Sequence, residues 1–166
     1  MNQSPLPAAI LAVALLFGLS QSYASAAPVP AQARYVDMSS YLTSDAGYEA
    51  WYTFRERLRQ NFDDICGDTF CEGDYSNIQP LRYRCSVNRV TGRLAMCMWM
   101  FAASNEEIEP ATGKIAVQDM AWHCRTPLAA GTTAGELLVA MQGDAPLDAP
   151  LPHTGKTIYE GLIDCL

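Results

Sequence analysis

Residues 81–101 read LRYRCSVNRVTGRLAMCMWMF, and this pattern predicts a β-hairpin. In residues 81–87 every second side chain is apolar, which is typical of a strand with one buried face. Residues 94–101 are almost continuously apolar and predict a strand that is covered on both faces. A loop of residues 90–92 joins the two strands, because Gly92 can adopt the left-handed backbone conformation that a tight hairpin needs.

The length of this loop sets the register of the predicted hairpin. It places Cys85 opposite Cys97, so that two thiols meet. A slip of one residue would turn the apolar side chains of one strand toward solvent, which makes the register specific. The other pairs expected from it are Arg89 with Arg93, Val87 with Ala95, Tyr83 with Trp99, and Leu81 with Phe101.

A long amphipathic helix is predicted before the hairpin. Between residues 48 and 65, apolar side chains recur at helical spacing, and Ser44 or Asp45 is the expected N-cap. We interpret its aromatic stripe as part of the protein core.

Three further elements are expected after the hairpin. Residues 115–125 predict a third strand, preceded by a turn at residues 110–113. Thr133 and Glu136 have the spacing of a capping box and begin a short helix, and residues 155–165 predict the last helix. The sequence therefore predicts an α+β fold, in which an N-terminal amphipathic helix lies on a three- or four-stranded antiparallel sheet and two helices follow.

The first 26 residues have the features of a cleavable secretory signal peptide. Residues 8–19 are apolar but too few to span a bilayer, and small residues follow at positions 24–26. We interpret residues 1–26 as the signal peptide, residues 27–43 as an extended leader and residues 44–166 as one domain. These boundaries predict a periplasmic or secreted protein without a membrane anchor.

The six cysteines all follow the predicted signal peptide, which favours structural disulfides. Their fifteen possible pairings cannot be separated by sequence alone. Loop size and the hairpin register favour three pairs: Cys66–Cys71, Cys85–Cys97 and Cys124–Cys165. A catalytic thiol is disfavoured, because neighbours such as His123 and Cys124 point to opposite faces of a strand.

The formal net charge of −7 argues against binding to nucleic acid or to anionic membranes. A basic protein partner would be attracted instead. The spacings of common hydrolase, zinc and phosphate-binding motifs do not occur in the sequence, so no metal ion or cofactor is expected. The sequence does not indicate an oligomeric state.

Residues 66–77, CGDTFCEGDYSN, form the densest polar segment and are predicted to be rich in turns. We expect a disulfide-bonded acidic loop that presents charge and aromatic rings to a protein partner. Alternatively, its aromatic rings bury against the first helix. The candidate binding residues are Asp68, Phe70, Glu72, Asp74 and Tyr75.

These observations predict an exported, non-catalytic protein-binding domain. A periplasmic inhibitor or immunity protein that blocks a cell-wall hydrolase or a toxin is the specific hypothesis, because an acidic blocker would be steered to a basic enzyme. Two alternatives remain open. One is a secreted hydrolase that uses a carboxylate pair such as Asp68 and Glu72, and the other is a structural or ligand-binding module of the envelope with a calcium-supported loop.

Overall fold

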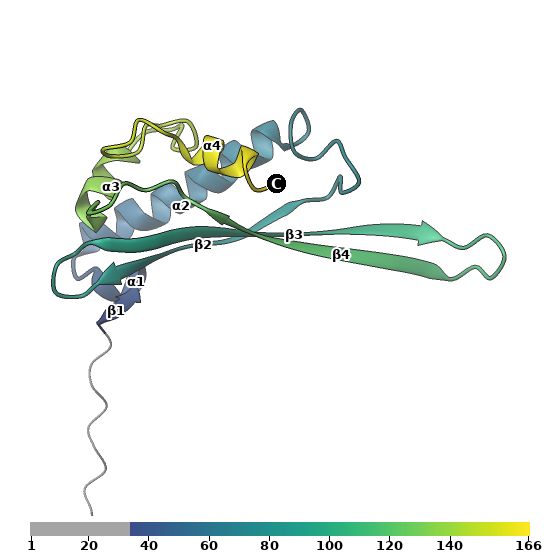
Figure 1. The fold of residues 1–166 in the computed structure, drawn as a ribbon, viewed down its shortest axis with the longest axis horizontal. Helices are drawn as coiled ribbons and strands as arrows, with labels where there is room; N and C mark the ends of the chain where they lie inside the picture. The colour runs from purple at the N-terminus through teal and green to yellow at the C-terminus, as the bar shows by residue number, and fades with distance from the viewer. Residues whose placement is uncertain (1–33) are drawn as a thin grey trace, which may run out of the picture. The chain divides into compact units, whose positions relative to one another are not determined.

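A computed structural model describes residues 34–166, which form one four-stranded antiparallel sheet and four helices. The strands lie in the order β1-β2-β3-β4 (Figure 1). The predicted α+β class is confirmed, whereas the predicted signal peptide lies outside the described residues. The elements are β1 (Tyr35–Asp37), α1 (Met38–Tyr41), α2 (Asp45–Cys66), β2 (Gln79–Asn88), β3 (Leu94–Ile108), β4 (Ile115–Arg125), α3 (Ala134–Ala140) and α4 (Ile158–Ile163).

Helix α2 lies along one face of the sheet and buries an aromatic stripe there (Figure 1). The Ser44 side chain caps its first turn by accepting a hydrogen bond from the Gly47 N–H. The ring of Phe62 contacts Trp99 and Phe101 of β3, with centroid distances of 5.6 and 4.9 Å. The core therefore forms between α2 and this face of the sheet.

The centre of the predicted hairpin register is confirmed, because Cys85 pairs with Cys97 and Tyr83 pairs with Trp99. Its two ends differ from the prediction. Val87 pairs with Leu94 rather than with Ala95, and Pro80 rather than Leu81 pairs with Phe101. Each difference marks a one-residue irregularity of the kind that β-bulges produce.

The connecting turn explains the first of these irregularities. The Asn88 N–H donates to the Arg93 carbonyl at 2.8 Å, so Arg89 does not face Arg93. The Asn88 Oδ1 accepts from the N–H groups of Val90 and Thr91, and Gly92 has a φ of 69°. The loop is one residue longer than predicted, and the irregularity in β3 restores the expected register beyond it.

Strand β3 is covered on one face only, which corrects the prediction of burial on both faces. Trp99 and Phe101 are buried beneath α2, whereas Met96, Met98 and Met100 on the other face are partly exposed. Beyond residue 103, β3 and β4 continue as a two-stranded ribbon that extends past the other elements, and most of its side chains are exposed (Figure 1).

Residues 35–41, which the sequence analysis placed in an extended leader, form strand β1 and helix α1. Val36 pairs with Val87, and Met38 is fully buried. Asp37 caps α1 by accepting a hydrogen bond from the Ser39 N–H. Three residues of strand are too few to produce a periodic pattern, so the sequence gives little indication of β1.

The two C-terminal helices both begin with a capping box. Thr133 and Glu136 cap α3 as predicted. Helix α4 starts at Ile158 rather than near residue 155, because Gly155 has a φ of 68° and Thr157 is the N-cap. Among the described residues, no helix combines the length and apolar character that crossing a membrane requires.

The structure confirms all three favoured disulfides. Two of them connect elements, Cys85–Cys97 within the hairpin and Cys124–Cys165 between β4 and the C-terminal segment. The third, Cys66–Cys71, closes the loop at the end of α2.

Candidate binding site on the acidic loop

The acidic loop, residues 66–77, starts at the last residue of α2 and is held there by several local bonds. The Cys66–Cys71 disulfide closes its first turn. The Cys71 N–H also donates to the Cys66 carbonyl at 2.7 Å, and the Thr69 hydroxyl donates to the Ile65 carbonyl at 2.7 Å. The start of the loop is therefore fixed to the helix.

The two aromatic residues of the loop make contacts inside the domain. Phe70 stacks on Phe62 of α2 with a centroid distance of 6.0 Å and also contacts Tyr159 of α4 at 5.8 Å. Tyr75 meets the ring of Trp122 edge-on at 5.6 Å. Both loop rings are partly buried, so they fix the loop to the body and offer only part of their surface to a partner.

The end of the loop is attached to β3 through Asn77. The Asn77 Oδ1 accepts from the Ser104 N–H at 2.9 Å, and the Asn77 Nδ2 donates to the Ser104 hydroxyl at 3.1 Å. The next residue, Ile78, is buried. The loop is thus attached at both ends and in the middle, to α2, α4, β3 and β4.

The acidic side chains of the loop point outward from this frame. Asp68, Glu72 and Asp74 are exposed, and none of the ion pairs within residues 34–166 involves them. In contrast, Asp63 in the preceding helix pairs with Arg59 at 2.8 Å. The loop therefore presents carboxylates that no basic side chain of the described domain neutralises.

The geometry of the loop gives no specific support to the metal and hydrolase alternatives. Within residues 34–166, no group of three or more His, Cys, Asp or Glu side chains is arranged to hold a metal ion. Asp68 and Glu72 lie on an exposed loop and line none of the five cavities described in this part of the chain. A carboxylate pair that cleaves a glycosidic bond needs a site that encloses the substrate.

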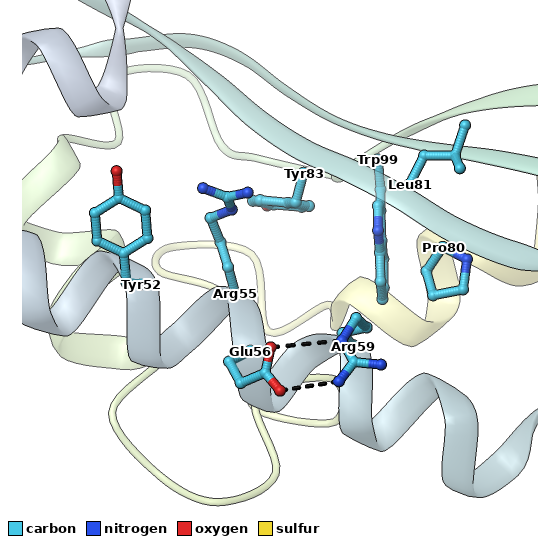
Figure 2. Close-up of a pocket in the computed structure, with 8 residues that line it drawn as sticks. All are labelled: Tyr52, Arg55, Glu56, Arg59, Pro80, Leu81, Tyr83 and Trp99. Carbon is cyan, nitrogen blue, oxygen red and sulfur yellow. Dashed lines mark hydrogen bonds and ion pairs between the residues drawn. The ribbon is translucent and has the colours of Figure 1, made fainter.

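Sequence reasoning did not find a second polar region, an arginine-lined cavity between α2 and β2. The patterns at residues 81–87 and 48–65 predict a half-buried strand and an amphipathic helix, in which Arg82, Arg84 and Arg55 are only polar surface positions. Figure 2 shows Arg55 reaching from α2 toward Tyr83 of the sheet. The alternation of Arg82 and Arg84 is a weak signal for this region, because their proximity to Arg55 depends on tertiary packing.

Comparison with known proteins does not assign the chain to a family. No protein-family model matches it, and neither curated proteins nor solved structures give a significant match.

Proposed function

We propose that this chain is an exported, non-catalytic protein-binding domain whose acidic loop binds a basic protein. The observation that carries the proposal is the contrast between the frame of the loop and its charges. Three carboxylates are exposed and unpaired in the described domain, while the backbone between them is fixed by a disulfide, two aromatic contacts and Asn77. A fixed loop loses little conformational entropy on binding, which favours affinity.

The partner that fits this surface best is an envelope hydrolase or a toxin with a basic active-site cleft. Enzymes that act on anionic polymers concentrate basic residues near the substrate, and an acidic loop would be attracted to the same residues. The domain would then act as an inhibitor or immunity protein. The three disulfides are compatible with a periplasmic or extracellular location, which the proposal adopts.

The experiment compares the oxidised domain with a variant in which the loop carboxylates become amides, D68N/E72Q/D74N. Each protein is immobilised and exposed to envelope and culture extracts, and proteins retained at moderate salt are identified by mass spectrometry. We expect the wild-type domain to retain a basic hydrolase or toxin in stoichiometric amount and to inhibit it. The loop variant should bind it at least about tenfold more weakly, because a desolvated charge pair contributes on the order of 1.5 kcal/mol or more.

A matched control is the variant E49Q/E107Q/D148N, which loses the same three negative charges at exposed positions outside the loop. It should retain the partner almost as well as the wild-type domain does. Equal weakening by the two variants would mean that only the net charge attracts the partner. Undiminished binding by the loop variant would contradict the proposal, and so would the absence of any saturable protein partner.

A further inference from the structure

The arginine-lined cavity lies between α2, α1 and β2 and encloses about 210 Å³. Three arginines are among its lining residues, Arg55 from α2 and Arg82 and Arg84 from β2. The hydroxyl-bearing residues Ser39 and Ser40 of α1 also line it. In a chain with a net charge of −7, this is a local concentration of positive charge.

Two of these arginines have no acidic partner. Among the ion pairs and side-chain hydrogen bonds of residues 34–166, none involves the guanidinium of Arg55 or Arg82. The guanidinium carbon of Arg55 instead lies 5.6 Å from the ring centres of Trp51 and Tyr52. These cation–π contacts orient the Arg55 group without neutralising it.

Trp51 provides a second, independent observation at the same cavity. Its side chain lines the cavity and is 1% exposed. The indole Nε1 is the one buried side-chain nitrogen or oxygen in the described residues that lacks a hydrogen-bond partner. A buried N–H without an acceptor is costly, so its presence beside unpaired arginines points to an acceptor supplied from outside the chain.

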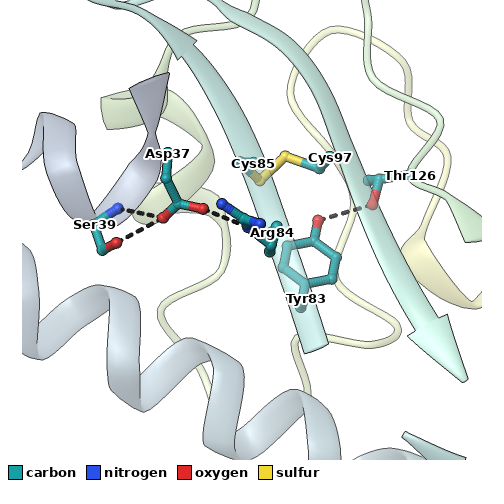
Figure 3. The surroundings of a disulfide bond; sticks show 7 residues. All are labelled: Asp37, Ser39, Tyr83, Arg84, Cys85, Cys97 and Thr126. Atoms are coloured by element: carbon teal, nitrogen blue, oxygen red, sulfur yellow. Dashed lines mark hydrogen bonds and ion pairs between the residues drawn. A yellow bond between two sulfur atoms is a disulfide. The ribbon is translucent and has the colours of Figure 1, made fainter. Parts of the chain in front are cut away.

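The single carboxylate of the cavity lining, Asp37, is already occupied. Its Oδ2 accepts from the Arg84 Nε at 2.7 Å, and its Oδ1 accepts from the N–H and the hydroxyl of Ser39 (Figure 3). Burial alone would raise the pKa of Asp37, but the bonds from Ser39 and Arg84 outweigh burial and leave the pKa lowered. Asp37 therefore stays ionised and holds Arg84 in place.

We infer that this cavity binds an oxyanion, either a carboxylate or a phosphate group. Apart from Asp37, the polar residues that line the cavity are three arginines, Trp51 and the hydroxyl-bearing Ser39, Ser40, Tyr52 and Tyr83, so the complementary ligand is an acceptor that carries negative charge. Arginine forks donate two parallel hydrogen bonds to carboxylate or phosphate oxygens. The lining leaves a net positive charge after the Asp37–Arg84 pair is formed.

An adjoining groove gives room for the rest of the ligand. It is shown in Figure 2 and shares Tyr52, Arg55 and Tyr83 with the arginine-lined cavity. Leu81 and Trp99 also line this groove, so an apolar or aromatic body attached to the anion has a surface to contact. Benzoate and inorganic phosphate are therefore probes that separate the two kinds of oxyanion.

The test is an NMR titration of the oxidised domain labelled with ¹⁵N, observed through its indole N–H signals. Trp51, Trp99 and Trp122 give one signal each. Titration with benzoate or with inorganic phosphate, against sodium chloride at equal ionic strength, should shift the Trp51 signal downfield and saturate. A response to benzoate alone assigns a carboxylate ligand, and a response to phosphate alone assigns a phosphate ligand. A signal that does not saturate with either probe overturns the inference.

Variants separate this site from general electrostatic attraction. R55Q/R82Q should weaken binding of the responding probe by about tenfold or more, since each charge-assisted hydrogen bond is among the strong ones in proteins. The matched control R89Q/R93Q removes the same charge from the β2–β3 turn and should leave the affinity within about twofold. Equal weakening by both variants would overturn the inference. The acidic loop is unchanged in all of these proteins, so the result is independent of the proposed protein partner.

Discussion

The acidic loop and the arginine-lined cavity carry opposite charges and are built in opposite ways. In the loop, aromatic residues such as Phe70 anchor the backbone from behind, and the carboxylates face solvent. In the cavity, Arg55 and Arg82 line a hollow together with Trp51, whose indole N–H is buried and has no hydrogen-bond partner. An exposed charged loop suits a large partner, whereas a hollow lined by donors suits a small anion.

The net charge of −7 does not reveal that the chain has both an acidic loop and an arginine-lined cavity. It indicates which macromolecules the whole chain repels at long range. Binding depends on how charges are grouped, and here Asp68, Glu72 and Asp74 lie in the loop that follows α2, while Arg55 lies in the middle of that helix. One helix therefore positions both regions.

The largest effect on this comparison is expected from Phe62→Ala. The Phe62 ring is fully buried and contacts Phe70 of the loop as well as Trp99 and Phe101 of the sheet. Its removal should lower the free energy of unfolding by about 3–5 kcal/mol and increase hydrogen exchange in the acidic loop. Chemical denaturation measures the first effect. A loss below about 1 kcal/mol would show that α2 and the loop do not depend on this contact.

The next effect concerns the two disulfides outside the hairpin. Cys124→Ser/Cys165→Ser opens a 41-residue separation and should cost about 4 kcal/mol, whereas Cys66→Ser/Cys71→Ser opens a separation of 5 and should cost about 2 kcal/mol. The second variant should nevertheless weaken partner binding more than the first, because it loosens the acidic loop. Denaturation curves measure the two losses of stability, and binding assays measure the two losses of affinity. A larger loss of affinity in Cys124→Ser/Cys165→Ser would contradict this prediction.

A smaller effect is expected at the hydroxyl pair of Tyr83, a residue that lines the arginine-lined cavity. The buried Tyr83 hydroxyl lies 2.8 Å from the Thr126 hydroxyl, and burial raises the pKa of the Tyr83 phenol. Thr126→Val leaves the phenol without this partner and should destabilise the domain by about 1–3 kcal/mol. Thermal unfolding compared with Thr132→Val, at another buried threonine, measures whether the hydroxyl pair has a specific role.

The raised pKa of Tyr83 also predicts a pH dependence. The folded state favours the neutral phenol. This contribution to stability is complete at pH values below the unfolded-state pKa, and it is lost as the pH rises from there through the folded-state pKa. Stability should therefore fall in the alkaline range, and Tyr83→Phe should reduce that fall. Denaturation at pH 8 and pH 11 tests this. An equal fall in both proteins would show that other groups cause it.

The smallest effect involves Asp37, whose pKa is lowered by the bonds from Ser39 and Arg84 that outweigh burial. A carboxylate with a lowered pKa stabilises the folded state at pH values above its unfolded-state pKa. This contribution is lost as the pH falls through the folded-state pKa. Asp37→Asn should therefore reduce stability by roughly 1 kcal/mol or less at pH 7 and by less at strongly acidic pH. Urea denaturation at the two pH values provides the comparison, and a larger difference at acidic pH would contradict this assignment.

The elements predicted best are those where two sequence signals coincide. Alternating apolar residues and the positions of Cys85 and Cys97 independently select one register, and the structure has that register at the centre of the hairpin. Its irregular ends could not be predicted, because they depend on the hydrogen bonds of Asn88 and on an interruption at Leu81. Strand β1 is too short to show a periodic pattern of apolar residues.

The two candidate sites also differ in how far the sequence predicts them. The acidic loop is continuous in sequence, so Asp68, Glu72 and Asp74 could be found from composition alone. Its anchoring contacts, such as Tyr75 on Trp122, join segments far apart in the chain. The arginine-lined cavity is formed entirely by such distant segments, and only the folded structure shows that Arg55 and Arg82 share it with Trp51.

The central claim is that the acidic loop is a preformed binding surface. The most direct test is ¹⁵N relaxation of its backbone amides in the oxidised, unbound domain, with α2 as the internal reference. We expect order parameters near 0.85 for residues 67–77, similar to those of α2, because the disulfide, the aromatic contacts and Asn77 fix the loop. Values below about 0.6 across the loop would show a flexible segment and would contradict the claim.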